Sequence, residues 1–237
     1  MQSYQRQYLK EMGIDVWLDK NTPVATNETV VEVQVAEKSI ATEVKATPSV
    51  LPEALNNLAK QVAACQQCVL QKSRTQTVFG VGNPDADWLV IGEAPGADED
   101  RQGEPFVGRA GKLLNSMLLA MGLRREQVFI ANILKCRPPN NRDPQAEEVQ
   151  ACETYLRQQI DLIKPKIILA VGRIAAQNLL KLETPIGKMR GNSYQYPDSE
   201  LPVIVTYHPA YLLRSPREKR KVWEDLKFAM RTYKAIT

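Results

Sequence analysis

The sequence predicts an α/β fold: a three-layer α/β/α sandwich around a central four-stranded, mainly parallel sheet. Three observations lead to this prediction: four short apolar runs rich in branched residues, helical stretches between them, and glycine- or proline-rich loops directly after the runs. Such apolar runs are typical of strands buried on both faces. Strands that alternate with helices require right-handed crossovers, and therefore a parallel sheet between two helical layers.

The elements follow in a regular order. The expected strands are 88–92 (WLVIG), 128–134 (VFIANIL), 166–171 (KIILAV) and 202–206 (PVIVT). The expected helices are 52–64, 109–121, 145–163, 172–182 and 216–234. Three unusual loops follow strands, at 93–108, 135–144 and 207–216. Because ligands of such sheets bind at the carboxyl ends of the strands, we expect these loops to form one site at one edge.

The folded domain is expected to span residues 51–237. Residues 1–18 carry aromatic and apolar side chains spaced like a short amphipathic helix. Residues 19–50 contain neither an aromatic residue nor a glycine, which favours a flexible linker, although the alternation in TVVEVQV would also suit a strand.

Composition limits the class of protein. Hydrophobic residues make up 43% of the 237, which is enough for a core. No apolar run approaches the ~18 residues that a membrane span needs, so we expect a cytoplasmic monomer without a membrane partner. The net charge of +4 is small, but basic residues gather near the loops, which would suit a polyanion. They are the run 214–221 and Arg101, Arg109, Lys112, Arg124, Arg125, Lys135, Arg137 and Arg142.

The four cysteines indicate a thiolate site. Cys65 and Cys68 form a C-x-x-C pair. Cys136 lies in an expected loop and Cys152 in the expected helix that follows, with fifteen residues between them. An intracellular chain disfavours structural disulfides. Zinc ribbons usually show two C-x-x-C pairs, and the only histidine is His208. The spacing alone therefore leaves an iron-sulfur cluster, a zinc ion and unligated thiols as alternatives.

Four motifs in order carry a specific resemblance. They are the C-x-x-C at 65–68, GEAPGADEDRQGEPFVGRAGKLL at 92–114, ANILKCRPP at 131–139 and YHPAYLLR at 207–214. Over about residues 55 to 235 the chain resembles the family 4 uracil-DNA glycosylases, the iron-sulfur type of bacteria and archaea. The resemblance implies that the four cysteines hold a 4Fe-4S cluster with a structural role.

The polar residue Asn132 interrupts an apolar run, so its amide needs partners in a buried place. An amide offers both a donor and an acceptor, which match O4 and N3–H of uracil and mismatch cytosine. By resemblance, Phe106 stacks on the uracil, His208 hydrogen-bonds O2 of the departing base, and Glu93 and Ala94 contact the base from the GEAPG loop. A neutral His208 would still stabilise the developing uracil anion as a donor.

The motif departs from the family 1 enzymes at two positions. Ala94 stands where family 1 carries an aspartate that positions the attacking water, and Gly96 stands where it carries a tyrosine that excludes thymine. We therefore expect the water to be held otherwise. Glu99 is our candidate for this catalytic role, with Asp100 and backbone carbonyls as alternatives.

DNA contacts are expected from the loop after His208. Leu212 or Leu213 would enter the base stack where the nucleotide left, and Arg214 and Arg109 would hold phosphates.

The sequence thus predicts a monofunctional uracil-DNA glycosylase acting by base flipping in base excision repair. No lyase activity is expected, because no motif position supplies a buried lysine nucleophile, and Lys135 is expected to face phosphate. The alternative is a non-catalytic iron-sulfur protein that binds DNA or accompanies replication. Residues 6–17, RQYLKEMGIDVW, resemble the segment of the clamp-loader psi subunit that docks on the chi subunit, so residues 1–18 are expected to bind chi.

Overall fold

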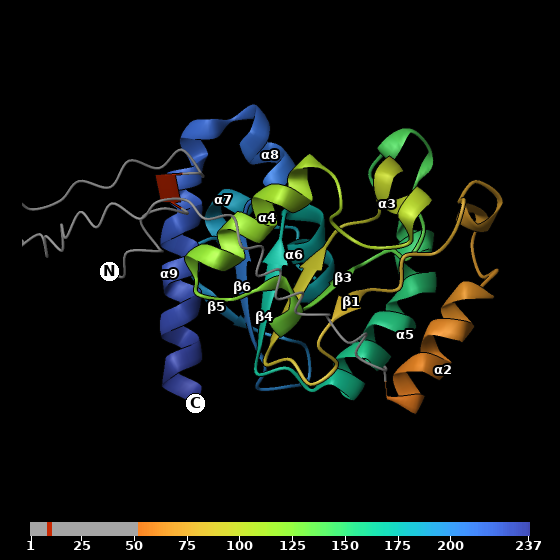
Figure 1. Ribbon diagram of the computed structural model, residues 1–237, viewed down its shortest axis with the longest axis horizontal. Coiled ribbons are helices and arrows are strands. Elements are labelled where there is room, and N and C mark those ends of the chain that lie inside the picture. The colour runs from red at the N-terminus through yellow and green to blue at the C-terminus, as the bar shows by residue number, and fades with distance from the viewer. Residues whose placement is uncertain (1–8, 11–51) are drawn as a thin grey trace, which may run out of the picture.

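The computed structural model describes residues 9–10 and 52–237 and shows an α/β protein (Figure 1). Its described residues form a sheet of six strands in the order β1-β3-β2-β4-β6-β5. The strands are β1 (Val81–Gly82), β2 (Trp88–Gly92), β3 (Phe129–Asn132), β4 (Ile167–Val171), β5 (Ser193–Gln195) and β6 (Pro202–Thr206).

The predicted four-stranded parallel centre is confirmed, since β3, β2, β4 and β6 pair in parallel. The two edge strands, β1 and β5, were not predicted from the sequence; they pair antiparallel with their neighbours. These strands have only two and three residues and are partly exposed. They therefore lack the apolar run that identifies a strand buried on both faces.

The predicted helices are also present, with ends shifted by a few residues. The helices are α2 (Glu53–Ala63), α4 (Arg109–Ala120), α5 (Ala146–Ile163), α6 (Arg173–Leu180) and α9 (Lys219–Ile236). Three short helices lie in the loops, namely α3 (Ala97–Gln102), α7 (Ile186–Met189) and α8 (Pro209–Arg214). Among the residues described, no helix has both the length and the apolar character needed to cross a membrane.

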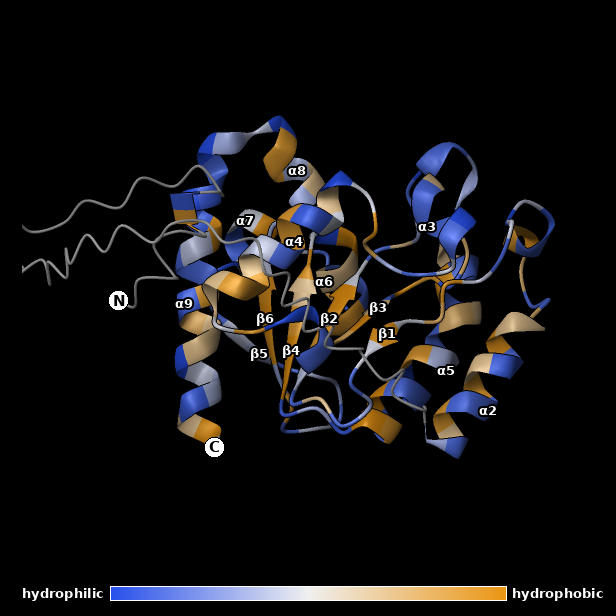
Figure 2. Ribbon diagram, in the orientation of Figure 1, coloured by the Kyte–Doolittle hydropathy of each residue, from blue (hydrophilic) through white to orange (hydrophobic). Residues whose placement is uncertain are grey.

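Helices cover both faces of the sheet, as Figure 1 shows. Alternate strand residues face opposite layers: Leu89 and Ile91 belong to a buried cluster with α2, α5 and α6, whereas Trp88 and Val90 belong to one with α4 and α9. Figure 2 shows the central strands as hydrophobic and the surrounding helices as mixed. This is the three-layer sandwich that the alternation of strands and helices predicts.

The predicted N-terminal segments, 1–18 and 19–50, lie outside the described residues except for Leu9 and Lys10. The side chain of Leu9 is fully buried and belongs to the same core cluster as Val222 and Leu226 of α9.

The strand register brings the functional loops to one edge. Gly92, the last residue of β2, pairs with Asn132, the last residue of β3. Thr206, the last residue of β6, pairs with Val171 at the end of β4. The loops that carry the predicted site residues therefore start side by side.

Candidate active site

A cavity of about 430 Å³ opens at the carboxyl ends of β2, β3 and β6. Seven of the predicted site residues line it, and they come from two loops, 93–108 and 207–216, and from strand β3: Glu93, Ala94, Glu99, Phe106, Asn132, His208 and Arg214. This volume suits a small planar ligand such as a single nucleobase with part of its sugar.

Asn132 is the most unusual polar residue of the cavity. Its side chain is 2% exposed, and its Oδ1 is buried without a hydrogen-bond partner within the described protein. A buried acceptor left unpaired is costly, so its partner is expected to come from a ligand. A Cβ at Gly92 would lie 2.5 Å from this Oδ1 and 2.6 Å from Cζ of Phe106, so only glycine leaves the approach to the amide open.

Phe106 forms a wall beside the amide. It is 6% exposed and has a positive φ of 55°, which is rare for a bulky side chain. The guanidinium of Arg125 donates to the carbonyls of Pro105 and Phe106 and so holds this turn. The ring lies 5.5 Å from the His208 ring, centroid to centroid, with 30° between the planes. Strained backbone of this kind is found where a side chain must be aimed at a site.

The burial and hydrogen bonding of His208 determine the protonation state of its ring. The backbone N–H of Ala210 donates to Nδ1 of His208 over 3.1 Å, which caps α8. Burial, and then the charge of Arg214, lower the pKa of His208 to about 4. The ring is therefore neutral at pH 7, and because Nδ1 accepts, the proton is on Nε2. Gly172 has a φ of +99°, and a Cβ there would lie 3.0 Å from Cβ of His208.

Glu99 ties two loops of the cavity together. One carboxylate oxygen accepts from the N–H groups of Val107 and Gly108 at 3.0 and 3.3 Å, and the other accepts from Gly96 N–H at 3.1 Å. A Cβ at Gly96 would approach this carboxylate to 2.6 Å, so the glycine makes room for Glu99. These bonds place the carboxylate beside the turn that holds Phe106.

Glu93 is a second carboxyl group in the cavity wall. Burial, and then the neighbouring Asp143, raise the pKa of Glu93 to about 7, while Arg173 acts in the opposite direction. Arg173 pairs with Asp143 at 2.6 Å. The carbonyl oxygen of Glu93 accepts from Leu134 N–H, which holds the GEAPG loop against the end of β3.

Of the four residues predicted to contact DNA, one is buried and three are exposed. Leu212 is fully buried in the core cluster with α4 and α9, so its prediction as a residue that enters DNA is wrong. Its neighbour Leu213 is 43% exposed. The turn of α8 explains the difference, because successive helical residues point about 100° apart. Arg109 and Arg214 are exposed, but only Arg214 lines the cavity.

Nine further cavity residues were not predicted as individual site residues: Pro95, Gly96, Ala110, Pro138, Asn141, Arg142, Asp143, Ala210 and Tyr211. Pro138, Asn141, Arg142 and Asp143 lie in the loop 135–144, which was expected at this edge because it follows a strand. Tyr211 stacks against Tyr207 at 4.9 Å between ring centroids, a contact that the sequence does not reveal.

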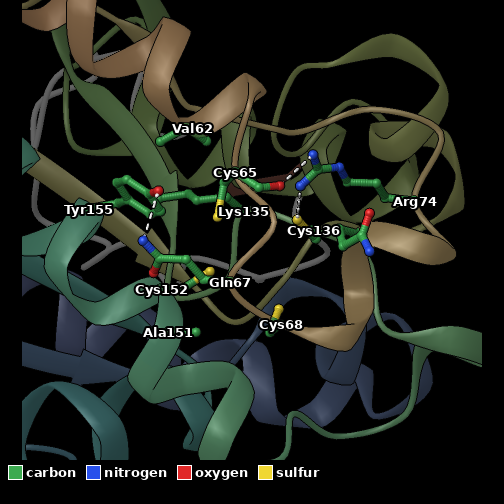
Figure 3. Close-up of a pocket in the computed structure, with 11 residues that line it drawn as sticks. Val62, Cys65, Gln67, Cys68, Arg74, Lys135, Cys136, Ala151, Cys152 and Tyr155 are labelled. Carbon is green, nitrogen blue, oxygen red and sulfur yellow. Dashed lines mark hydrogen bonds between the residues drawn. The ribbon is translucent and has the colours of Figure 1, made fainter.

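The four cysteines surround a second, smaller cavity (Figure 3). Its lining contains all four thiols but no histidine and no carboxylate. Burial raises the pKa of Cys136, and that of Cys152 to about 11, so these thiols are protonated at pH 7 and would lose their protons on binding a metal. The described residues include no group of three or more His, Cys, Asp or Glu at the close spacing of ligands to one ion.

Two basic side chains lie beside these cysteines. Arg74 Nη1 donates to Cys136 Sγ over 3.1 Å, and Nη2 donates to the Cys65 carbonyl oxygen over 2.8 Å. Lys135 also lines this cavity and is only 1% exposed, so the prediction that Lys135 faces phosphate is wrong. Burial lowers its pKa to about 7, while Cys152 and Cys136 act in the opposite direction. All-thiol ligands with cationic neighbours fit an anionic thiolate cluster.

Comparison with known proteins agrees with this geometry. Residues 79–227 match the Uracil DNA glycosylase superfamily. The chain is 48% identical over 181 residues to the type-4 uracil-DNA glycosylase of Archaeoglobus fulgidus, covering 74% of this chain and 91% of the relative. It is 43% identical over 180 residues to that of Thermotoga maritima, covering 75% and 93%. A type-5 uracil-DNA glycosylase of Pyrobaculum aerophilum is 30% identical over 146 residues, covering 55% and 64%. The chain therefore belongs to the uracil DNA glycosylase superfamily and, within it, to the type-4 uracil-DNA glycosylases.

Proposed function

We propose that the protein is a monofunctional uracil-DNA glycosylase that hydrolyses the N-glycosidic bond of deoxyuridine in DNA, the first step of base excision repair. The observation that carries this proposal is the unpaired Oδ1 of Asn132, which shares one cavity with Phe106 and His208. A DNA-repair enzyme acts on chromosomal DNA, so we propose that the protein is cytoplasmic. We also propose that it acts as a monomer.

The cavity supports the recognition of uracil after the nucleotide has left the base stack. Uracil N3–H would donate to the unpaired Oδ1 of Asn132, and O4 would accept from its Nδ2. Cytosine reverses this pattern and would leave buried polar groups unpaired. Phe106 would stack on the base, and the Glu93–Ala94 loop would contact its edge.

Bond cleavage would be assisted by His208. As the C1′–N1 bond breaks, the electron pair moves to the uracil, and the neutral imidazole donates from Nε2 to O2 of the forming anion. Water adds its oxygen to C1′ and releases a proton, which neutralises the uracil anion, so that uracil leaves as the free base. Glu99 is our candidate for holding this water, since its carboxylate lines the same cavity and is fixed by three backbone donors.

The cysteines Cys65, Cys68, Cys136 and Cys152 would hold a 4Fe-4S cluster. Bound there, the cluster would supply structure rather than chemistry, because it joins the end of α2, the loop after β3 and the helix α5. The donor set supports this assignment, since four thiols line one cavity with Arg74 donating to one of the sulfurs.

The exposed side chain on α8 gives a prediction about DNA binding. Leu213→Ala should lower excision from duplex DNA several-fold without changing stability, because a wedge acts only when the nucleotide must be extruded. Leu212→Ala is the matched comparison: it should lower the free energy of unfolding by about 2–5 kcal/mol through the cavity it leaves. Excision from single- and double-stranded substrates and denaturant unfolding measure the two effects. Equal loss from both substrates in Leu213→Ala would contradict a wedge.

The function is tested by excision from a uracil-containing oligonucleotide, using anaerobically purified protein and alkaline cleavage to reveal abasic sites. The proposal expects uracil-dependent strand cleavage after alkali and none before it, because no lysine of the described residues lines the active-site cavity and the buried Lys135 lies at the cysteine site instead. The alternative is a non-catalytic iron-sulfur protein that binds DNA or accompanies replication. Protein with intact thiolate-to-iron absorbance that binds DNA without excising uracil would favour that alternative.

For residues 1–18 we propose docking to the chi subunit of the clamp loader, with 19–50 as the connecting linker. The resemblance of RQYLKEMGIDVW to the psi segment supports it. Removing residues 1–50 should leave excision within about twofold of the full chain and abolish chi binding, as a tethered docking segment would. Calorimetry with chi and the excision assay measure both. Loss of excision on truncation would instead assign the segment to the catalytic domain, where Leu9 already contributes to the core.

A further inference from the structure

Lys135 carries a buried amine that the proposed reaction does not use. Its Nζ donates to the carbonyl oxygen of Asn132 at 2.8 Å and to Oε1 of Gln159 at 2.5 Å. Gln159 is itself fully buried and donates through Nε2 to the carbonyl of Phe79 at 2.9 Å. The amine of Lys135 is thus fixed by a chain of hydrogen bonds that begins at the strand carrying Asn132.

Lys135 also borders the cysteine site. It directly precedes Cys136 in the chain and lines the cavity that the four cysteines surround. Residues packed around the ligands of a metal group hold those ligands in place. One residue therefore joins the cysteine site through its main chain and bonds the carbonyl oxygen of Asn132 through its side chain.

We propose that Lys135 is a positioning residue that couples the four-cysteine site to the base-reading amide of Asn132. This inference rests on the proposed function. The side-chain oxygen of Asn132 has no partner in the described protein, so the place of the amide depends on its backbone. Lys135 fixes that backbone at its carbonyl group, and the main chain of Lys135 continues directly into Cys136.

Arg74 offers a matched comparison. Like Lys135 it is a basic residue beside the cysteines, but within the described residues its guanidinium donates to Cys136 Sγ and to the carbonyls of Ala63 and Cys65. Arg74→Met removes a basic side chain from the cysteine site and leaves the bond to Asn132 intact. Lys135→Met removes a basic side chain and that bond together.

The experiment compares Lys135→Met, Arg74→Met and the unchanged protein at equal iron content, judged by thiolate-to-iron absorbance. The probe is a single-stranded oligonucleotide carrying 2′-fluoro-2′-deoxyuridine, whose glycosidic bond resists hydrolysis. A 2′-deoxycytidine oligonucleotide of the same sequence serves as reference, because cytosine reverses the donor and acceptor pattern that the Asn132 amide reads. The ratio of the two affinities therefore measures base reading. A second readout, the rate of cluster loss in the presence of a chelator, should rise in both variants.

We expect Lys135→Met to lose about tenfold or more of the affinity ratio, the size of one displaced hydrogen bond. Arg74→Met should keep the ratio within about threefold. Gln159→Leu, which touches no cysteine, should give an intermediate loss with unchanged iron content, and it serves if Lys135→Met does not fold.

An unchanged ratio in Lys135→Met or Gln159→Leu, or an equal loss in Arg74→Met, would overturn the coupling. Unchanged protein that neither excises uracil nor prefers the analogue would overturn the proposed function as well, so the two failures are distinguishable.

Discussion

His208→Ala should lower the single-turnover rate of uracil excision by about 10²–10³-fold, the usual cost of removing one donor to a developing anion. The reason is that the neutral ring presents Nε2–H to the cavity while Nδ1 is engaged by Ala210 N–H. The DNA affinity should change little, because the bond strengthens in the transition state. Excision and binding assays on the same oligonucleotide separate the two.

The protonation state behind this prediction is measurable because His208 is the only histidine. Nitrogen NMR of the ring should show the Nε2–H tautomer and a pKa near 4. Since the folded pKa is depressed, the group contributes stability above about pH 6.5 that is lost as the pH falls through the folded value. A tautomer protonated at Nδ1, or a charged ring at pH 7, would contradict the assigned role.

Asn132→Ala should lower excision between about 10²- and 10⁴-fold, because it removes both the acceptor and the donor that read the base. Part of this loss should appear as weaker discrimination of uracil from cytosine in binding. Steady-state kinetics measure the loss of excision, and competition binding measures the loss of discrimination. Asn178→Ala, on α6 and outside this cavity, is the control and should act like the unchanged protein. Normal excision by Asn132→Ala would remove the basis for base reading by this residue.

The fold was predictable because each central strand is a continuous apolar run. The run 88–92 forms β2 over the same residues, since both faces of that strand are covered by helices. The edge strands β1 and β5 left no such signal, because short, partly exposed strands have no need of apolar residues on both faces.

A site residue could be predicted from the sequence where its polarity differs from that of its neighbours, as for the polar Asn132 in an apolar strand. Residues whose role depends on the orientation of their side chains could not be predicted in this way. Leu212 and Leu213 look equivalent in the sequence, and only the phase of α8 buries one and exposes the other. Lys135 was predicted to contact phosphate, but its side chain is buried and donates to the Asn132 carbonyl oxygen and to Gln159. Spatial neighbours of this kind arise from tertiary packing rather than from local pattern.

The central claim is that the cavity at Asn132, Phe106 and His208 selects and releases uracil. The most direct measurement is the release of free base from three oligonucleotides that differ only in carrying uracil, thymine or cytosine at one position. The account predicts release of uracil alone, with an abasic site left in the DNA. Release of thymine or cytosine at a comparable rate, or no release of uracil by protein with full iron content, would contradict it.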